Sequence, residues 1–247
     1  MAKALQQWIE EDVGELRERP LGWLSEQHFF RDPVRPIYAD TSFFFAPADG
    51  VVLYQEEVEP DESIVDIKGR PYSLQEALRD EAYDKRSLVI GIFMTFFDVH
   101  VNRVPYPGRL SYRELDPIDT LNHPMLAVEE SILEDLRVAP AEAEYLHHNQ
   151  RMVNRVDASP LDERYFILQI ADYDVDCITP FELKQNQPCL QGQRFSQIRY
   201  GSQVDLIIPL SERWHFVPTQ AVHCHVEAGV DTLVAVHEQQ TNGAPAP

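Results

Sequence analysis

Two strand-forming runs meet at a Gly-Ser pair in the stretch QRFSQIRYGSQVDLIIP, residues Gln193–Pro209. The runs Arg194–Arg199 and Gln203–Pro209 are rich in Phe, Ile, Val and Leu, so each is expected to form a β-strand. A Gly-Ser pair between two strands is most often a tight turn. The Ser202 hydroxyl also has a chemical alternative. It can attack the carbonyl carbon of Gly201 if the turn is strained, because glycine has no side chain to block the approach.

The strand pattern continues outward from this stretch in both directions. Short runs of the same character, separated by turn residues, predict further strands at Gly50–Gln55, Ser63–Ile67, Leu88–Met94, Tyr165–Ala171 and Thr232–His237. The sequence therefore predicts a mainly β (α+β) protein with a single compact β-rich domain, residues 29–238. The tail at 239–247, which contains GAPAP, is expected to be disordered.

Helical signals are fewer. Ser73 and Glu76 have the spacing of a capping box, which predicts a short helix after Ser73. Residues Ala127–Leu136 have helical periodicity, but a loop is an equal alternative. The N-terminal segment, residues 1–28, is expected to be an amphipathic helix that docks on the main domain, since its apolar residues have helical spacing: Leu5, Trp8, Ile9, Val13 and Leu16.

The composition restricts the partners. The chain has 247 residues and a net charge of -20, with 41 acidic against 21 basic residues. A surface this acidic repels phosphates, which argues against a nucleic acid partner and weakens attraction to an anionic membrane. The sequence has neither a run of ~18 apolar residues nor the apolar core of a secretory signal. Its three cysteines lack the spacing of a zinc site. We expect a cytoplasmic protein, with peripheral membrane contact and a homodimer as further options.

Two acidic residues and a histidine are candidates for chemistry. Asp98 and His100 follow an apolar run at i, i+2, so on a strand both side chains would lie on one face. A carboxylate beside a histidine can fix its tautomer and prepare it as a general base. The alternative is a structural His–Asp pair at a strand end. Asp49, in the pair Asp49-Gly50, marks either a turn or a second acid at the start of a strand.

Other polar clusters have simpler explanations. The run His223-Cys224-His225 has two ligand types but no third ligand at matching spacing, so no metal site is predicted. His147 and His148 are expected in a surface loop. The acidic residues of the 127–136 segment are expected on a solvated face: Glu129, Glu130, Glu134 and Asp135.

Six ordered blocks resemble phosphatidylserine decarboxylases, most closely the short form that includes archaetidylserine decarboxylases. The resemblance covers about residues 29–236. The blocks are FFRDPVRP (29–36), APADGVV (46–52), IKG (67–69), FMTFFDVHVNR (93–103), NQR (149–151) and GQRFSQIRYGSQVDLIIP (192–209). Any one block would be a weak signal, whereas six in order are a strong one.

The resemblance implies a self-processing, pyruvoyl-dependent carboxy-lyase. Cleavage between Gly201 and Ser202 would give chains 1–201 and 202–247, which stay together, and a pyruvoyl cofactor derived from Ser202. Asp49 and His100 would activate the Ser202 hydroxyl, with Asp98 and Arg103 in support. The amine of phosphatidylserine would form a Schiff base at residue 202 and lose carbon dioxide to give phosphatidylethanolamine.

Three departures from the family pattern keep alternatives open. Arg103 stands where long members have a second histidine, Gln203 follows the nucleophile, and the apolar anchor common before the catalytic domain is not in this sequence. One alternative is a pyruvoyl enzyme for a soluble amino acid, which the acidic surface favours. Another is a non-cleaving relative that serves as a binding or scaffold protein, which the intact Ser202, His100 and Asp49 disfavour.

Overall fold

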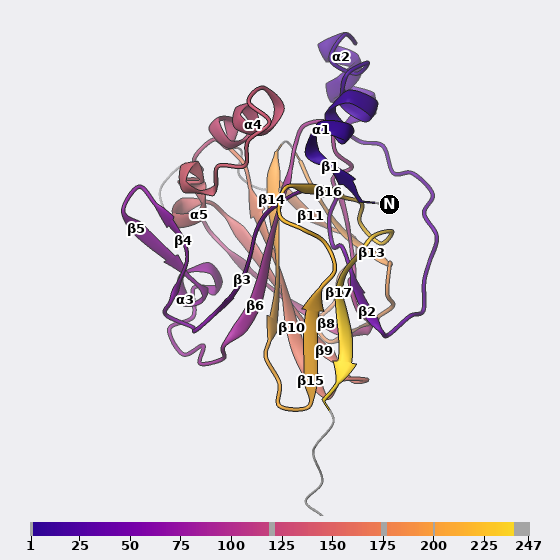
Figure 1. Ribbon diagram of the computed structural model, residues 1–247. Coiled ribbons are helices and arrows are strands. Elements are labelled where there is room, and N and C mark those ends of the chain that lie inside the picture. The colour runs from indigo at the N-terminus through magenta and orange to yellow at the C-terminus, as the bar shows by residue number, and fades with distance from the viewer. Residues whose placement is uncertain (1, 119–121, 174–176, 200, 240–247) are drawn as a thin grey trace, which may run out of the picture.

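The computed structural model describes residues 2–118, 122–173, 177–199 and 201–239 (Figure 1). Each predicted strand is present, with ends that agree to within a few residues. The predicted disordered tail lies outside the described residues apart from Gln239.

A nine-stranded antiparallel sheet forms the centre of the molecule. Its strands, in spatial order, are β1 (Lys3–Ala4), β16 (Cys224–Val226), β3 (Gly50–Val58), β6 (Ser87–Met94), β14 (Ser202–Pro209), β10 (Glu163–Ala171), β9 (Arg151–Ala158), β8 (Gly108–Leu115) and β12 (Gln187–Cys189). All residues of β6 and β14 are buried, which explains why both read as nearly continuous apolar runs.

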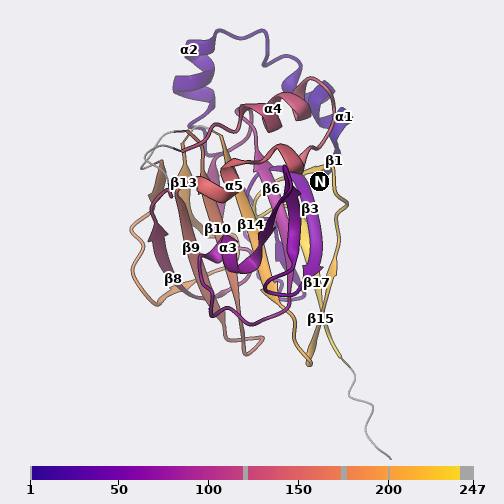
Figure 2. The same ribbon diagram turned by 90° about the vertical axis from the view of Figure 1, so that its left-hand side faces the viewer.

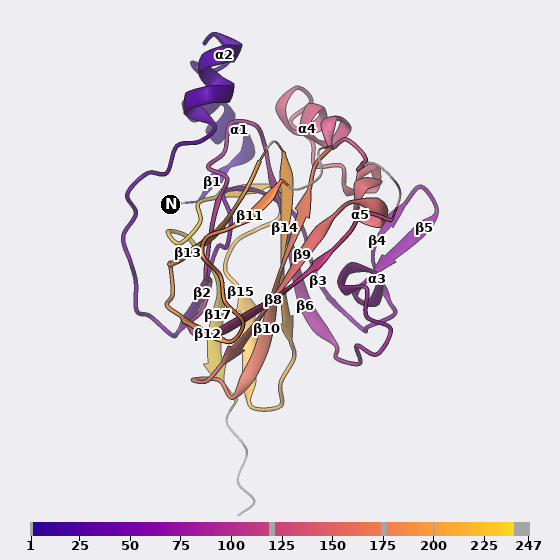
Figure 3. The ribbon, with the colours of Figure 1, turned by 180° about the vertical axis from the view of Figure 1, so that it is seen from behind.

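Three smaller sheets and the helices cover the two faces of the central sheet. The small sheets are β11 (Ile178–Pro180), β13 (Arg194–Ile198) and β7 (Val101–Arg103); β15 (Trp214–Pro218), β17 (Thr232–Glu238) and β2 (Phe43–Phe45); and β4 (Ser63–Ile67) with β5 (Arg70–Ser73). Figure 3 shows β2, β13 and β17 on one side and β4, β5 and α3 on the other. Two apolar cores result, one on each face of the central sheet. A single β-rich domain is confirmed.

Two of the strands that the sequence did not predict, β8 and β9, carry many polar residues. In β8 only Leu110 is buried, because this strand lies next to the sheet edge and its side chains face solvent. In β9 most residues are buried, but Arg151, Asn154, Arg155 and Asp157 interrupt its apolar pattern. Alternation alone could not separate these strands from loops.

The helices partly follow the prediction. The helix α3 (Leu74–Leu78) begins at the predicted cap, where the Ser73 hydroxyl accepts a hydrogen bond from the Glu76 N–H at 3.3 Å. The segment that the sequence left open contains a helix, α4 (Leu126–Leu133), and the remaining short helices are η3 (Pro140–Glu142) and α5 (Tyr145–His148).

The N-terminal segment folds as two helices rather than one. The first, α1 (Leu5–Trp8), continues into the π-helical turn η1 (Ile9–Val13), and the second, α2 (Leu21–Trp23), continues into η2 (Leu24–His28). Pro20 precedes the second helix, because its fixed φ and missing N–H suit a helix start. The predicted docking of the first helix is confirmed by the burial of Leu5, Trp8 and Val13.

The helical segments gather at one end of the sheet. Figure 2 shows α1, α2 and α4 together above the strands, at the end where β14 begins. Among the described residues, no helix has the length and apolar character needed to cross a bilayer.

Candidate active site

Ser202 is the first residue of β14 and is fully buried between two neighbouring strands. It pairs with Met94 of β6 on one side and with Ala171 of β10 on the other. Its hydroxyl donates a hydrogen bond to the Met94 Sδ at 3.1 Å. A thioether sulfur is a weak acceptor. The candidate nucleophile is therefore held inside the protein, and the described residues offer its hydroxyl no strong hydrogen-bond partner.

Gly201 adopts a conformation that requires glycine. Its φ of +43° lies in the left-handed region, where side chains are disfavoured. A Cβ at this position would also lie 2.5 Å from the Asp172 Oδ2. The Asp172 carboxylate is held in place, since its Oδ1 accepts a hydrogen bond from the Met125 N–H at 2.8 Å. The bond predicted to break thus follows a residue whose position excludes any side chain.

The sulfur of Met94 is also the end of a buried polar chain. Asn102 donates to it at 3.6 Å, Gln169 donates to Asn102 at 2.6 Å, and Asn154 donates to Gln169 at 2.9 Å. All of these side chains are buried. Since His100 precedes Asn102 by two residues, this chain places the candidate base at the same end of the sheet as Ser202.

His100 is buried and has one nitrogen without a hydrogen-bond partner. Its Nδ1 lies 3.1 Å from the carbonyl oxygen of Asp98, and this oxygen can only accept. The Nδ1 therefore carries the proton, and the buried Nε2, which has no partner among the described residues, is an acceptor. Burial lowers the pKa of His100 to about 4, although the negative charge of Asp98 acts to raise it. At neutral pH His100 is an uncharged imidazole with a free basic nitrogen.

Asp98 does not orient His100 in the way the sequence predicted. Both residues lie in the connection between β6 and β7 and not on a strand, and the His100 ring contacts the main-chain carbonyl of Asp98 instead of its carboxylate. The carboxylate Oδ2 accepts from the N–H and the hydroxyl of Thr95, both at 2.8 Å. Its Oδ1 accepts from His225 Nε2 at 2.6 Å. The turn from Thr95 to Asp98 is thereby closed by the carboxylate.

The Asp98–His225 contact is a buried ion pair. Burial would raise the pKa of Asp98, but the charge of His225 and the hydrogen bonds to the carboxylate hold it below the ordinary value. Burial would likewise lower the pKa of His225, but the Asp98 carboxylate raises it above the ordinary value. Both shifts favour the charged forms of the two residues.

Asp49 is buried beside Arg35 and not against Ser202. The Arg35 guanidinium binds both of its oxygens, at 2.5 Å and 2.6 Å, and the Ala228 N–H donates to it at 2.8 Å. No hydrogen bond joins Asp49 to Ser202 or His100 in the described part of the chain. Its predicted role in activating Ser202 stays a prediction.

Arg103 connects loops around the site. It donates to Asp32 at 3.1 Å and to the carbonyl oxygen of Gly192 at 3.1 Å. Gly229 packs against the aliphatic part of the Arg103 side chain, since a Cβ at Gly229 would approach the Arg103 Cδ to 3.0 Å. Its predicted supporting role stays a prediction, since no hydrogen bond to Ser202 is present among the described residues.

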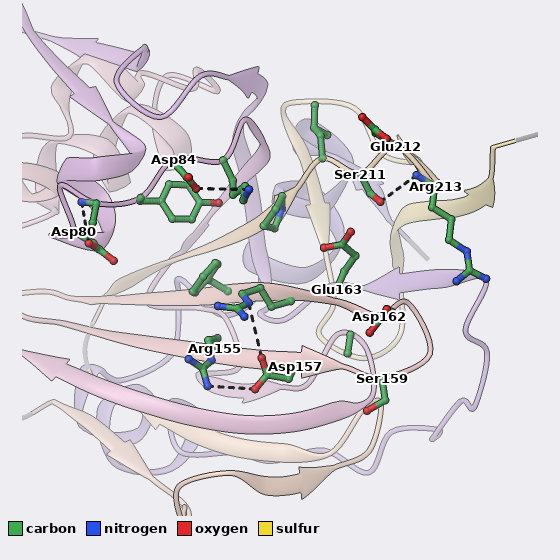
Figure 4. Close-up of a pocket in the computed structure, with 18 residues that line it drawn as sticks. Asp80, Asp84, Arg155, Asp157, Ser159, Asp162, Glu163, Ser211, Glu212 and Arg213 are labelled. Atoms are coloured by element: carbon green, nitrogen blue, oxygen red, sulfur yellow. Dashed lines mark hydrogen bonds and ion pairs between the residues drawn. The ribbon is translucent and has the colours of Figure 1, made fainter. Parts of the chain in front are cut away.

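Of two hollows in the protein, one is lined by predicted site residues and the other is not. A polar cavity of about 210 Å³ is lined by Asp49, Asp98, His225, Arg31 and Arg35 on one side and by the first N-terminal helix on the other. The larger hollow, about 970 Å³, is shown in Figure 4. Pro209, which ends β14 at the far end from Ser202, is one of its lining residues. Asp49 and Asp98 line the smaller cavity, which therefore borders the candidate site, whereas none of the predicted site residues lines the larger one.

The comparison with protein families agrees with this geometry. The family model described as phosphatidylserine decarboxylase matches residues 27–232, which include Asp49, His100 and Ser202. The chain belongs to the phosphatidylserine decarboxylase family.

Similar curated proteins carry the same description. The phosphatidylserine decarboxylase proenzyme of Erythrobacter litoralis is 35% identical over 183 residues, which cover 73% of this chain and 62% of the relative. The proenzyme of Cupriavidus pinatubonensis is 30% identical over 75% of this chain and 68% of the relative. That of Novosphingobium aromaticivorans is 32% identical over 73% of this chain and 62% of the relative. The chain thus spans about two thirds or less of the length of these family members.

Several residues of the site were not singled out from the sequence. Phe29, whose ring centroid lies 4.1 Å from that of His100, belongs with Arg31 and Arg35 to the block FFRDPVRP, so the family resemblance held a signal for all three. His225 was considered only as a metal ligand. Its pairing with Asp98, 127 positions away, has no local signal.

Two of the simpler explanations are wrong. His147 is not in a surface loop but buried in α5, with its Nδ1 2.6 Å from Glu76 Oε1. Glu129 does not share the solvated face of Glu130, because its carboxylate accepts from the Phe96 N–H at 2.8 Å. Burial raises the pKa of Glu129 to about 7. For Glu130 and the remaining two acidic residues of the run, Glu134 and Asp135, the predicted exposure is confirmed.

Proposed function

We propose that this chain is a self-processing phosphatidylserine decarboxylase that cleaves its own Gly201–Ser202 bond. The observation that carries the proposal is the combination of a buried, neutral His100 with a free Nε2 and a buried Ser202 hydroxyl next to a left-handed glycine. Family membership supports the same reaction, since the similar proteins are named as proenzymes.

Cleavage begins with attack of the Ser202 Oγ on the Gly201 carbonyl carbon. His100 Nε2 accepts the hydroxyl proton, the C–N bond breaks, and the freed amine of residue 202 takes up a proton, which leaves an ester between Gly201 and Ser202. Loss of the α-proton of residue 202 then expels the Gly201 carboxylate and leaves dehydroalanine. Addition of water and release of ammonia give the pyruvoyl group. In the uncleaved chain the hydroxyl must first leave Met94, since it donates to that sulfur.

The surroundings of residue 202 fit the resulting pyruvoyl group. Residue 202 is fully buried between two strands, so water has little access. Once formed, the group would serve as an electron sink for loss of the substrate carboxylate. His100, neutral and buried at the same end of the sheet, would hold or deliver the proton that replaces carbon dioxide at the substrate α-carbon.

The two product chains would remain together for a structural reason. Residues 202–247 contain β14, which pairs along its whole length with β6 and over six residues with β10, both in the large chain. These strands are buried on both faces, so separation would expose the central part of both cores.

A lipid substrate is supported by exposed apolar side chains on the second N-terminal helix. Leu21 is 72% exposed, Trp23 is 37% exposed and Phe30, just beyond the helix, is 41% exposed. Arg19 lies over the Trp23 ring at 5.7 Å and adds a cation to this surface. Arg17 lies nearby in sequence. We expect this surface to make peripheral contact with a membrane despite the overall charge of -20.

The reaction is tested by mass spectrometry of the purified protein. The wild type should give two chains with a pyruvoyl group at the start of the smaller one, and Ser202→Ala should give one chain. An uncleaved wild type after prolonged incubation at neutral pH would remove the proposal and favour a binding or scaffold protein.

The substrate is tested with the processed enzyme. We expect carbon dioxide release from phosphatidylserine in detergent micelles, and on anionic vesicles a rate that rises with added salt because screening weakens the repulsion. Release from a soluble amino acid, with no activity on micelles, would replace the lipid assignment by the amino acid alternative.

A further inference from the structure

The N-terminal strand and helix are built onto the strand that carries His225. Lys3 of β1 pairs with His225 of β16, and the Trp8 ring stacks on the His225 ring with centroids 4.4 Å apart and an angle of 8° between the planes. Both rings are buried. Since the family model matches only from residue 27, Trp8 lies outside the part of the chain that defines the family.

The contact continues from His225 to the candidate base. His225 donates to one oxygen of Asp98, and the other oxygen closes the turn by accepting twice from Thr95. The Asp98 N–H returns a hydrogen bond to the Thr95 carbonyl at 3.0 Å. This closed turn presents the Asp98 carbonyl to the Nδ1 of His100, which leaves the Nε2 as the acceptor.

We propose that Trp8 and His225 are positioning residues for self-cleavage, which act by holding the Asp98 turn and through it the orientation and tautomer of His100. The N-terminal segment is then a working part of the site as well as a cover over it. This inference rests on the proposed function, because it requires His100 to be the base.

The same contact joins the two product chains. His225 belongs to the chain that begins at residue 202, whereas Trp8 and Asp98 belong to the chain that ends at Gly201. The stack and the ion pair form before cleavage and link the chains after it. A defect in either would therefore affect both the cleavage rate and the later proton transfer by His100.

Several other charged groups surround His225, and their charges also influence how the cleavage rate depends on pH. Besides Asp98, the charged residues around it on the walls of the polar cavity are Lys3, Asp12, Arg31, Arg35, Asp49 and Glu227. Arg35 and Asp49 neutralise each other, and Lys3 binds Asp12 at 2.5 Å. Arg31 donates to the Asp98 carbonyl at 3.3 Å and to that of Phe97 at 2.6 Å, so it supports the same turn.

The test compares self-cleavage rates of freshly refolded variants. We expect Trp8→Ala to slow cleavage by about 10- to 100-fold, the range produced by a small misplacement of a catalytic group, and Trp8→Phe to restore most of the rate by keeping a stacked ring. Leu5→Ala is the matched control. It removes a buried side chain from the same helix that, among the described residues, neither stacks on His225 nor hydrogen-bonds to it, and should change the rate by less than about 3-fold.

A second pair of variants tests the hydrogen bond. His225→Gln keeps an N–H donor for Asp98 and should cleave faster than His225→Ala. The pH dependence separates positioning from loss of structure. If the turn opens in His225→Ala and water reaches His100, its pKa should rise from about 4 towards the ordinary 6.5, so that cleavage is lost below about pH 6 instead of about pH 4.

The outcomes distinguish this inference from the proposed function. If the wild type cleaves and depends on His100, but the Trp8 and His225 variants keep its rate and pH profile, the inference is wrong and the function stands. If the wild type does not cleave, or His100→Ala cleaves normally, the proposed function fails first. Should His225→Ala not fold, the comparison of Trp8→Ala, Trp8→Phe and Leu5→Ala decides.

Discussion

The Ser202 hydroxyl and the Met94 sulfur face each other across β14 and β6, 3.1 Å apart. The candidate nucleophile of the uncleaved chain thus donates its proton to a weak acceptor and not to the candidate base. Transfer of the Ser202 hydroxyl proton to the free nitrogen of His100 therefore requires the Ser202 side chain to rotate away from Met94. This arrangement leads to the first prediction.

Met94→Leu should accelerate self-cleavage. The substitution nearly conserves volume but removes the acceptor, so the uncleaved state loses a hydrogen bond worth about 1 kcal/mol that the transition state does not use, which predicts an increase of about 5-fold. The rate is measured by gel densitometry after rapid refolding. Met152→Leu, which replaces a buried methionine of β9, is the control. Slower cleavage in Met94→Leu would mean that the sulfur assists the reaction.

Gly201→Ala should block cleavage by at least about 100-fold. Alanine at φ +43° costs about 1–2 kcal/mol, and its Cβ would collide with the Asp172 carboxylate, so the scissile carbonyl must move. The double variant Gly201→Ala, Asp172→Ala should recover part of the rate because the collision is removed. Mass spectrometry of the purified variants gives the fraction cleaved. Equal rates in the single and double variants would show that the backbone conformation alone is responsible.

The cleavage rate should be nearly independent of pH between about 5 and 8 and should fall below about pH 4. Only the neutral imidazole accepts a proton, and the pKa of His100 is lowered to about 4 by burial, so the base loses its capacity only as the pH falls through that value. His100→Ala should be slower by about 10² to 10⁴-fold. A midpoint near 6.5 in the wild type would indicate that His100 is solvated when it reacts.

Asp205 should make the uncleaved protein less stable as the pH rises from about 4 to 6. It is fully buried, accepts hydrogen bonds from Gln203 at 2.6 Å and Tyr54 at 2.9 Å, and burial raises its pKa to about 6. The folded state then binds more protons than the unfolded state in this window, so the free energy of unfolding falls by up to about 3 kcal/mol as the proton is lost.

Urea unfolding at pH 4.5 and pH 7 measures this effect in a Ser202→Ala background, which prevents cleavage. His100, whose pKa is lowered, contributes a change of opposite sign between about 4 and 6.5. The quantity to compare is therefore the difference between Asp205 and Asp205→Asn at each pH. If that difference is the same at both pH values, Asp205 is ionised throughout and the prediction is wrong.

The sequence predicted those features of the structure that depend on consecutive residues. The apolar runs of β6 and β14 predicted two strands, and the Ser73 cap predicted the start of α3. The position of Gly201-Ser202 between two strands follows from the same pattern. The blocks around Asp49, His100 and Ser202 were sufficient to predict the family, which the comparison with known proteins confirmed.

Partners of buried polar groups could not be predicted in this way. Asp98 was expected to contact His100, two residues away, through its carboxylate, but this carboxylate contacts His225, 127 positions away. Asp49, which the family motif assigned to Ser202, binds Arg35, and its role toward Ser202 stays a prediction. In both cases the predicted partner was close in sequence or in a family motif, whereas the observed one depends on which strands and loops become neighbours.

The sequence alone determined the strands with apolar runs, the Gly201–Ser202 junction and the residue types available for chemistry, because strand periodicity and motif spacing are properties of consecutive residues. The tertiary structure alone decided that Met94 holds the Ser202 hydroxyl, that His225 closes the turn at Asp98 and that Trp8 stacks on His225. These contacts depend on the order of strands in the sheet and on docking of the N-terminal helix. Both are set by burial of apolar surface across the whole chain, and no local pattern encodes them.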